Sequence, residues 1–420
     1  METTKSINAF PGYKFVDGKN MYRGVNVGRG GYIVATPGAH ENVAVLDVAS
    51  MHPHSILAMN CFGDHTKNFK DLVDARIAIK HGDYDTAKQM LNGKLAPYLE
   101  DETKAKDLAQ ALKIAINSVY GLTAASFDNP FHDVRNKNNI VALRGALFMK
   151  TLQDEVEKRG YTIVAIRTDS IKIANADKDI IDFCLEFAKK YGYNFEHEAT
   201  YSKICQINDA DYIARLASHD WCKEKYGYVP GDNVKKGGKW SVTGKQFAIP
   251  YVFKTLFSHE PIDFKDLCVT SAANTALYLD MNEKKYLHHL NLIGIEPEKD
   301  ECVDENCIRK YFKSLKFPKS DIDAIFADPD NHDYVFVGRV GSFVPVIPGA
   351  NGGLLMREKD GKYFAAAGSK GFRWLEEEQI KKLGLTDKID MRYFRELATE
   401  MKNAISKYCD FEWFIGGEYE

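Results

Sequence analysis

The sequence predicts an α+β protein, in which helices and antiparallel strands occupy separate stretches of a 420-residue chain. Residues 67–91 and 101–120 have the apolar spacing of two successive helices. Residues 161–175 have the pattern of a β-hairpin, and residues 334–374 that of strands joined by tight glycine turns. A chain of this length can bury the cores of two or three subdomains.

The remaining elements follow from the same patterns. Residues 1–41 are rich in glycine and aromatic residues, which predicts loops and short strands. Further helices are expected over 139–159, 180–193, most of 246–325 and 375–408. Strand-like sequence runs from residue 194 to Arg215. The stretch from Lys235 to Lys245 carries four lysines and no acid, and we place a subdomain boundary there.

Composition limits the class of protein. A hydrophobic content of 45% is typical of a folded globular chain, and no apolar run approaches the roughly 20 residues of a membrane span. The net charge of −3 does not indicate a nucleic-acid binder, although local patches can still bind phosphates. The eight cysteines are scattered without a Cys-x-x-Cys pair, so we expect reduced thiols and a cytoplasmic protein.

Two isolated aspartates lie at the edges of apolar strands. Asp47 ends the run from Val43, and Asp169 follows the run from Ile163. Two carboxylates can hold a pair of metal ions if the fold brings their strands side by side. For either aspartate alone, the ordinary interpretation is a residue that caps a turn.

A helix rich in polar residues lies between these aspartates in the sequence. Its apolar stripe is expected from Leu108, Ala111, Leu112, Ala115 and Val119. At about 100° per residue, Lys113, Asn117 and Tyr120 fall opposite that stripe, and Gly121 is expected to end the helix. A cationic, polar helix face between two carboxylates can hold a triphosphate.

Arg76 and Lys80 are four residues apart on one face of the preceding helix. Such a pair can bind the same phosphates. A solvated basic face is the alternative.

Three segments, in this order and spacing, resemble the polymerase motifs of family B DNA polymerases, most closely the compact polymerases of bacteriophages. They are Asp47 to Pro53, Lys113 to Gly121, and Thr168 to Ser170. The resemblance implies a right-hand polymerase fold, with an antiparallel-sheet palm, two-helix fingers and a mixed helical and β thumb. It implies palm at residues 1–60 and 126–230, fingers at 61–125, and thumb with the C-terminal region at 231–420.

The resemblance also implies roles for individual residues. Asp47, Asp169 and the carbonyl of Val48 would bind two Mg²⁺ ions, with Mn²⁺ able to substitute. At the phosphates of the incoming deoxynucleotide, the expected contacts are Arg76, Lys80 and Lys113, and Lys113 is also the expected proton donor. Asn117 and Tyr120 are expected to lie under the new base pair, and His52 is expected to contact the sugar. The expected contacts to DNA are Gly30 and Gly31 at the template, Tyr212, Arg215 and Lys203 at the primer, and Lys235, Lys236 and Lys239 along the duplex.

The sequence departs from the family in three places. Arg167 stands where the third motif usually has its first aspartate, and His52 replaces the usual tyrosine. In the strand that grips the primer, the usual basic positions are Ala210 and Asp211. Because the first motif begins near residue 43, we expect no exonuclease domain of the kind that the family usually carries before the palm.

The predicted function is template-directed DNA synthesis from a primer 3′ end during phage DNA replication, in the cytoplasm of an infected bacterial host. The expected partners are primer–template DNA and deoxynucleoside triphosphates, with a separate exonuclease subunit or a processivity factor as further candidates and no membrane. Three alternatives stay open. They are the polymerase subunit of a split enzyme, a catalytically silent DNA-binding module, and a primase-like or template-independent transferase.

Overall fold

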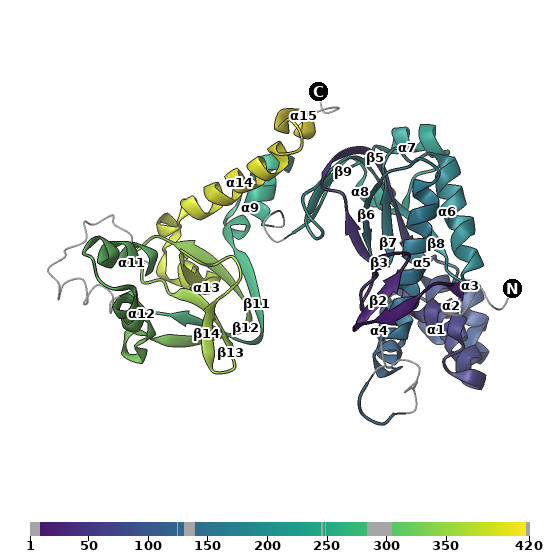
Figure 1. Cartoon of the computed structure of the whole chain (residues 1–420), viewed down its shortest axis with the longest axis horizontal. Helices are drawn as coiled ribbons and strands as arrows, with labels where there is room; N and C mark the ends of the chain where they lie inside the picture. The colour runs from purple at the N-terminus through teal and green to yellow at the C-terminus, as the bar shows by residue number, and fades with distance from the viewer. Residues whose placement is uncertain are drawn as a thin grey trace. The chain divides into compact units, whose positions relative to one another are not determined.

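The computed structural model describes residues 9–123, 125–129, 139–244, 247, 249–283 and 305–416. The chain divides into two compact units, drawn in Figure 1. The first unit comprises Met1–Thr243 together with Tyr408–Glu420, and the second comprises Gly244–Lys407.

The first unit contains a seven-stranded sheet whose adjacent strands are all antiparallel. Its strand order is β10-β9-β8-β5-β7-β6-β4. The strands are β4 (Ile33–Ala35), β5 (Gly38–Val48), β6 (Ile163–Arg167), β7 (Ser170–Ile173), β8 (Phe195–Gln206), β9 (Tyr212–Leu216) and β10 (Trp240–Thr243). A small separate sheet holds β1 (Lys14–Val16), β2 (Lys19–Tyr22) and β3 (Val25–Asn26).

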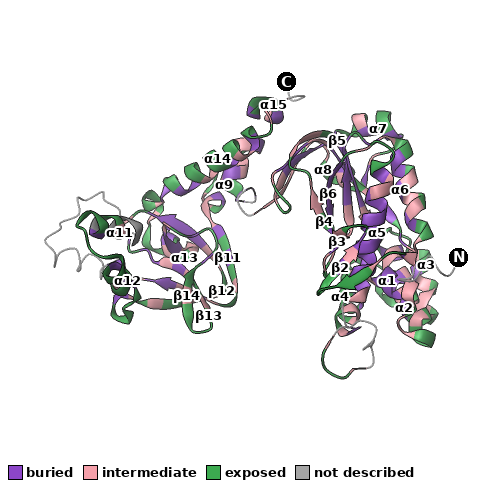
Figure 2. Cartoon of the chain, viewed as in Figure 1, coloured by how far each residue is buried: buried purple, intermediate pink, exposed green. Residues whose placement is uncertain are grey.

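Side chains of β5 alternate between the two faces of this sheet. Ala44 and Leu46 belong to the core formed with α5 (Ile140–Glu157) and α6 (Lys178–Lys190). Figure 2 shows α5 as largely buried. Val43 and Val45 belong to a separate cluster on the opposite face. Asp47 continues the second set, so its carboxylate lies on the sheet face away from α5.

Four helices form a second core in this unit: α1 (Met51–Met59), α2 (Thr66–Lys80), α3 (Tyr84–Gln89) and α4 (Glu102–Thr123). Short 3-10 turns lie at Gly63–His65, Met90–Gly93 and Ala96–Tyr98. The prediction of one helix over 67–91 is wrong because the chain breaks after Lys80. Gly82 adopts a φ of 77°, and Asp83 caps the next helix by accepting a hydrogen bond from the Thr86 amide.

The predicted geometry of α4 is wrong in two respects. Gly121 does not end the helix, which continues to Thr123. Ala111 and Ala115 are exposed, whereas Tyr120 packs partly buried against the helical core. The true apolar stripe runs through Leu108, Leu112 and Ile116 to Tyr120, at the 4-residue spacing of one helix face.

The second unit holds a five-stranded antiparallel sheet of order β14-β13-β11-β12-β15. The strands are β11 (Val269–Asp280), β12 (Tyr334–Val346), β13 (Leu354–Lys359), β14 (Lys362–Ala365) and β15 (Arg373–Glu376). Its helical segments are α9 (Pro250–Phe253), a π-helical turn (Lys254–Ser258), α11 (Glu305–Ser314), α12 (Lys319–Ala327), α13 (Glu377–Leu383) and α14 (Met391–Ser406), with 3-10 turns at Phe264–Leu267, Pro329–Asn331 and Thr386–Lys388. The prediction that 246–325 is mostly helical is wrong over 269–280, where the chain forms β11, and residues 284–304 of that stretch lie outside the described residues.

The boundary between the two units falls between Thr243 and Gly244, which is inside the stretch from Lys235 to Lys245 and later than residue 231, the start of the thumb that the resemblance implies. Three short helices belong to the first unit: α7 (His219–Tyr226), α8 (Gly231–Lys236) and α15 (Phe411–Ile415). Because α8 carries Lys235 and Lys236, and β10 pairs with β9, the lysine-rich stretch is part of the first unit. Lys245 lies outside the described residues.

The mixture of helices and antiparallel sheets confirms the α+β class. Within the described residues, no helix is both long enough and apolar enough to cross a membrane. The described cysteines Cys61, Cys184, Cys205, Cys222, Cys268 and Cys409 are free thiols.

Candidate active site

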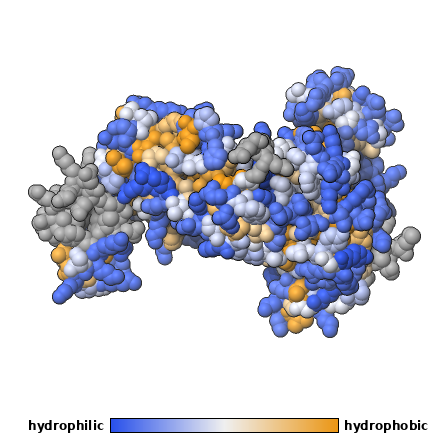
Figure 3. Space-filling model, turned by 90° about the horizontal axis from the view of Figure 1, so that it is seen from above, coloured by the Kyte–Doolittle hydropathy of each residue, from blue (hydrophilic) through white to orange (hydrophobic). Residues whose placement is uncertain are grey.

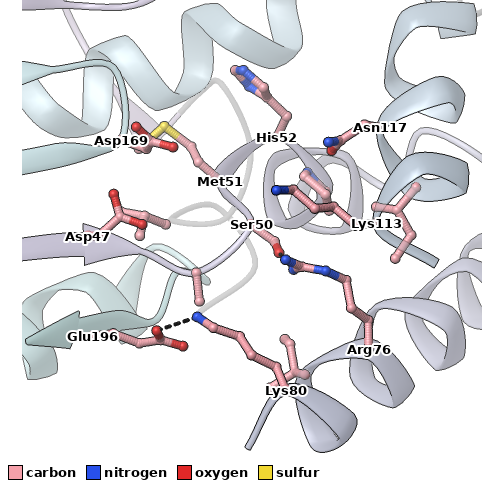
Figure 4. A pocket seen from close by; sticks show the side chains of 15 residues that line it. Asp47, Ser50, Met51, His52, Arg76, Lys80, Lys113, Asn117, Asp169 and Glu196 are labelled. Carbon is pink, nitrogen blue, oxygen red and sulfur yellow. Dashed lines mark hydrogen bonds and ion pairs between the residues drawn. The ribbon is translucent and has the colours of Figure 1, made fainter. Parts of the chain in front are cut away.

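Asp47 of β5 and Asp169, in the turn between β6 and β7, line the same pocket, shown in Figure 4. Asp47 lies at the end of β5, directly opposite Ser170 of β7. The Val48 amide donates a 2.8 Å hydrogen bond to the Asp169 carbonyl, which fixes the two segments together. Antiparallel strand pairing therefore brings together two aspartates that are 122 positions apart in the sequence.

The turn that carries Asp169 is tight. Thr168 adopts a left-handed φ of 56°, and the Asp169 amide donates to the Arg167 carbonyl at 2.7 Å. Gly31 lies against this turn, and a Cβ atom at that position would be 2.7 Å from the Thr168 hydroxyl oxygen. Gly31, one of two glycines predicted to lie near a template, therefore has a packing role beside the carboxylates.

Three cationic side chains and an amide line the same pocket. Arg76 and Lys80 come from α2, and Lys113 and Asn117 come from α4. The Arg76 guanidinium donates to the Ser50 hydroxyl at 2.7 Å, and Lys80 forms a 2.6 Å ion pair with Glu196. Among the described residues, Lys113 has no ion pair. The carboxylates and the cations project into one pocket from different elements (Figure 4).

The pocket also contains the beginning of α1. Ser50 precedes this helix in a left-handed conformation, with a φ of 57°, and Ser50, Met51 and His52 all line the pocket. His54 is the first residue whose amide donates back along the helix, to the Ser50 carbonyl at 3.1 Å. The amides of Met51 and His52 precede that bond, and such a helix start favours a bound anion.

The electrostatics of the two carboxylates indicate a place for a cation. Burial raises the pKa of Asp47 to about 7, and the charges of Asp169 and Glu198 add to the effect. Burial also raises the pKa of Asp169. Two hard carboxylate donors of this kind suit Mg²⁺, which usually binds one or two protein carboxylates together with substrate phosphates. No group of three or more His, Cys, Asp or Glu side chains within the described ranges forms a dedicated metal cage.

His52 stacks on Tyr120, with ring centroids 4.4 Å apart and planes 12° from parallel. The Tyr120 hydroxyl donates to Asn139 at 2.9 Å. Burial lowers the pKa of His52, so its imidazole is neutral at pH 7. His52 Nδ1 is buried without a hydrogen-bond partner within the described part of the chain.

Two polar side chains of the pocket, those of Glu196 and Ser50, were not predicted as site residues from the sequence. Glu196 of β8 lies directly opposite Asp47, and its carboxylate holds both Lys80 and His81, the latter at 3.1 Å. Strand alternation places Glu196 on the sheet face of Asp47, but only the register between β5 and β8 identifies it as a pocket residue.

The residues predicted to hold the primer do not line this pocket. Tyr212 lies under the buried Lys172, whose ammonium is 4.7 Å from the ring centroid. Lys203 donates to the Trp413 carbonyl at 2.6 Å, and Arg215 is buried with its guanidinium over Trp240.

The other predicted DNA contacts also lie outside the pocket. Gly30 is exposed beside Gly31. Lys235 and Lys236 are exposed at the end of α8, and the Lys239 carbonyl accepts from the Leu216 amide at 2.8 Å. Arg167 is exposed and donates to the Ala210 carbonyl at 3.3 Å, so it does not compete for the pocket carboxylates.

The chain is similar to known proteins in structure only. No protein-family model matches the chain, and no curated protein matches it. Among solved structures, it is similar to the family B DNA polymerase from the hyperthermophilic archaeon Pyrobaculum calidifontis, with 12% sequence identity and a TM-score of 0.41. The match covers 89% of this chain and 46% of that polymerase, so the chain spans about half the length of the structure it resembles.

Proposed function

We propose that this protein is a template-directed DNA polymerase that extends a primer 3′ end with deoxynucleoside triphosphates. The observation that carries the proposal is a single pocket lined by Asp47 and Asp169, by three cationic side chains and by the start of α1. Carboxylates that can hold divalent ions beside groups that can hold phosphates are the requirements of phosphoryl transfer. The right-hand architecture and the role in phage replication follow only from the resemblance of the three motifs.

The residues divide the chemistry between them. Asp47 and Asp169 would hold two Mg²⁺ ions, which when bound neutralise charge on the attacking and leaving oxygens. Lys113 and Arg76 bind the triphosphate, Lys113 holding the proton that the pyrophosphate leaving group requires. Asn117 comes from the same face of α4 as Lys113 and lies where it can contact the bound nucleotide.

The test is extension of a labelled primer on templates that differ only in the next base, with Mg²⁺ and one deoxynucleotide at a time. We expect wild-type protein to add only the complementary nucleotide, and Asp169→Ala to add none. Addition without regard to the template would support a terminal transferase instead.

A silent DNA-binding module is the second candidate, favoured by the protein contacts that already occupy Lys203 and Arg215. Tight binding of primer–template by a wild-type protein that extends no primer would establish that function and exclude the polymerase.

His52 is expected to help exclude ribonucleotides, because its ring is held beside the pocket by Tyr120. Replacing His52 with alanine should increase incorporation of a ribonucleotide relative to its deoxynucleotide by about tenfold, the effect of losing one close packing contact. The measurement is single-nucleotide kcat/KM for both sugars. Tyr120→Phe, which retains the stacked ring, serves as the control, and an unchanged ratio in His52→Ala would place sugar selection elsewhere.

A further inference from the structure

A β-hairpin near the N-terminus exposes both apolar and basic side chains. Strands β1 and β2 are joined by Asp17 and Gly18, whose φ values of 49° and 73° are those of a tight two-residue hairpin turn. Every residue of β1 is exposed, including Phe15 at 47% and Val16 at 46%. Phe15 is thus an aromatic ring that the fold leaves exposed beside the turn, where the base of a single strand can stack on it. In β2, by contrast, Asn20 and Tyr22 are buried, so the exposed part of the hairpin is β1 and the turn. Figure 3 shows how hydrophobic and hydrophilic side chains are distributed over one face of the molecule.

The base of the hairpin is rigid. Asn20 is buried, accepts a 2.9 Å hydrogen bond from the Tyr13 hydroxyl and donates a 2.7 Å bond to the Gly28 carbonyl. The next residues are attached to α5: the Tyr22 hydroxyl lies 3.1 Å from that of Thr151, and Arg23 pairs with Asp154 at 2.7 Å. The exposed tip is therefore held at a fixed position on the first unit.

The charge of the tip suits a polyanion. Residues 14–29 contain four basic residues and a single acid, Asp17. Arg23 is paired with Asp154, whereas Lys14 and Lys19 are exposed on the hairpin. Arg29 adds a third cation at the turn, where its guanidinium donates to the Gly18 carbonyl at 3.0 Å.

A continuous series of contacts joins the tip to the pocket. The Arg29 carbonyl accepts a 2.9 Å hydrogen bond from Asn139, which in turn accepts one from the Tyr120 hydroxyl. Tyr120 stacks on His52 at the pocket wall. Arg29 is thus connected to the pocket residue His52 through two intervening side chains, those of Asn139 and Tyr120.

We propose that the hairpin tip, defined as Lys14–Lys19 with Arg29, binds single-stranded DNA, namely the template ahead of the pocket. A base stacks on Phe15 while Lys14, Lys19 and Arg29 contact phosphates. Aromatic rings beside cations bind single strands in this manner without regard to sequence. The identification of the strand as a template rests on the proposed polymerase function.

The test compares binding to three fluorescent DNA probes by anisotropy: a primer–template with a template overhang of about ten nucleotides, the same duplex with a single templating base, and a free single strand. Phe15→Ala should weaken binding to the first and third probes by about tenfold and leave the second unchanged, because the loss of one stacked base is confined to the overhang. Phe364→Ala is the matched control, since Phe364 is a strand phenylalanine of the second unit with a similar exposure of 45%.

The outcomes separate this proposal from the polymerase assignment. Equal affinity of wild type and Phe15→Ala for the overhang would overturn the hairpin site even if primers are extended normally. A loss of single-strand affinity in Phe15→Ala supports the site, even if wild-type protein extends no primer and the polymerase proposal fails. Lys19→Glu provides a second variant, and its affinity should fall most at low salt, because phosphate contacts are screened by ions.

Discussion

Replacing Asp47 with asparagine should raise the free energy of unfolding of the metal-free protein at pH 8 by up to about 4 kcal/mol, although it removes a predicted catalytic residue. The pKa of Asp47 is raised to about 7 by burial and by neighbouring carboxylates, led by Asp169. At pH 8 the native state must therefore hold a poorly solvated charge that the unfolded chain holds in water. Asparagine has nearly the same shape and carries no charge.

The pH dependence gives the sign of this effect. An aspartate in the unfolded chain ionises near the ordinary value of 3.8, whereas the pKa of native Asp47 is about 7. Between these values the native state keeps a proton that the unfolded state has lost, so wild-type stability falls as pH rises through the window. The advantage of Asp47→Asn should be absent at about pH 3.5 and complete at pH 8, as measured by urea unfolding with EDTA present.

Replacing Asp154, a carboxylate with cationic partners, should have the opposite effect on stability. The pKa of Asp154 is lowered because Lys150 and Arg23 pair with it, which outweighs its partial burial. Asp154→Asn should therefore destabilise the protein at neutral pH. A destabilised Asp47→Asn at pH 8 would show that Asp47 has a native partner that offsets its burial.

With Mg²⁺ present, wild-type protein should be more stable than Asp47→Asn, the reverse of the order expected without metal. A cation that binds only the native state stabilises it in proportion to the logarithm of its concentration over the dissociation constant. Wild-type protein should gain stability on addition of Mg²⁺, and Asp47→Asn should gain little. Primer extension by the variant should fall by at least about a thousandfold, the scale of losing a group that acts on charge in the transition state.

The sequence predicted the parts of the site that local patterns encode. The hairpin around Asp169 was predicted correctly, because apolar strands on both sides of a short polar turn leave few alternatives. The association of Asp47 with Asp169 is different, since strand patterns do not specify which strands pair. Only the resemblance of the three motifs suggested that these aspartates share a site.

The errors have physical causes as well. Strand β11 was predicted as helix because its centre, from Ser271 to Ala276, contains three alanines, which favour helices, and only one β-branched residue, Thr275. Gly121 is tolerated inside α4 because packing of Leu112 and Ile116 stabilises the helix beyond its local propensity. Glu196 could not be predicted, because a register shift between Val45 and Leu46 determines which β8 residue lies opposite Asp47.

The three pocket cations should contribute unequally to nucleotide binding. Lys113 has no ion pair among the described residues. A triphosphate can therefore form a charge-assisted hydrogen bond with Lys113 without first displacing a carboxylate. Replacing Lys113 with alanine should lower kcat/KM for a complementary deoxynucleotide by about thirtyfold, the effect of one such hydrogen bond. Lys80→Ala should have a smaller effect, because phosphate must first displace Glu196 from Lys80.

Glu196→Gln tests this competition directly. The ion pair of Lys80 and Glu196 is partly exposed, with 48% and 33% of the side chains accessible, so its contribution is less than about 1 kcal/mol. Removing the negative charge should therefore increase nucleotide affinity by no more than about fivefold. The gain should disappear in the Lys80→Ala background, since a double-mutant cycle isolates the interaction between two contacting residues. If Glu196→Gln instead weakens nucleotide binding in both backgrounds, the Glu196 carboxylate supports the bound substrate rather than competing with it. Glu196 would then be a third carboxylate of the site, beside Asp47 and Asp169.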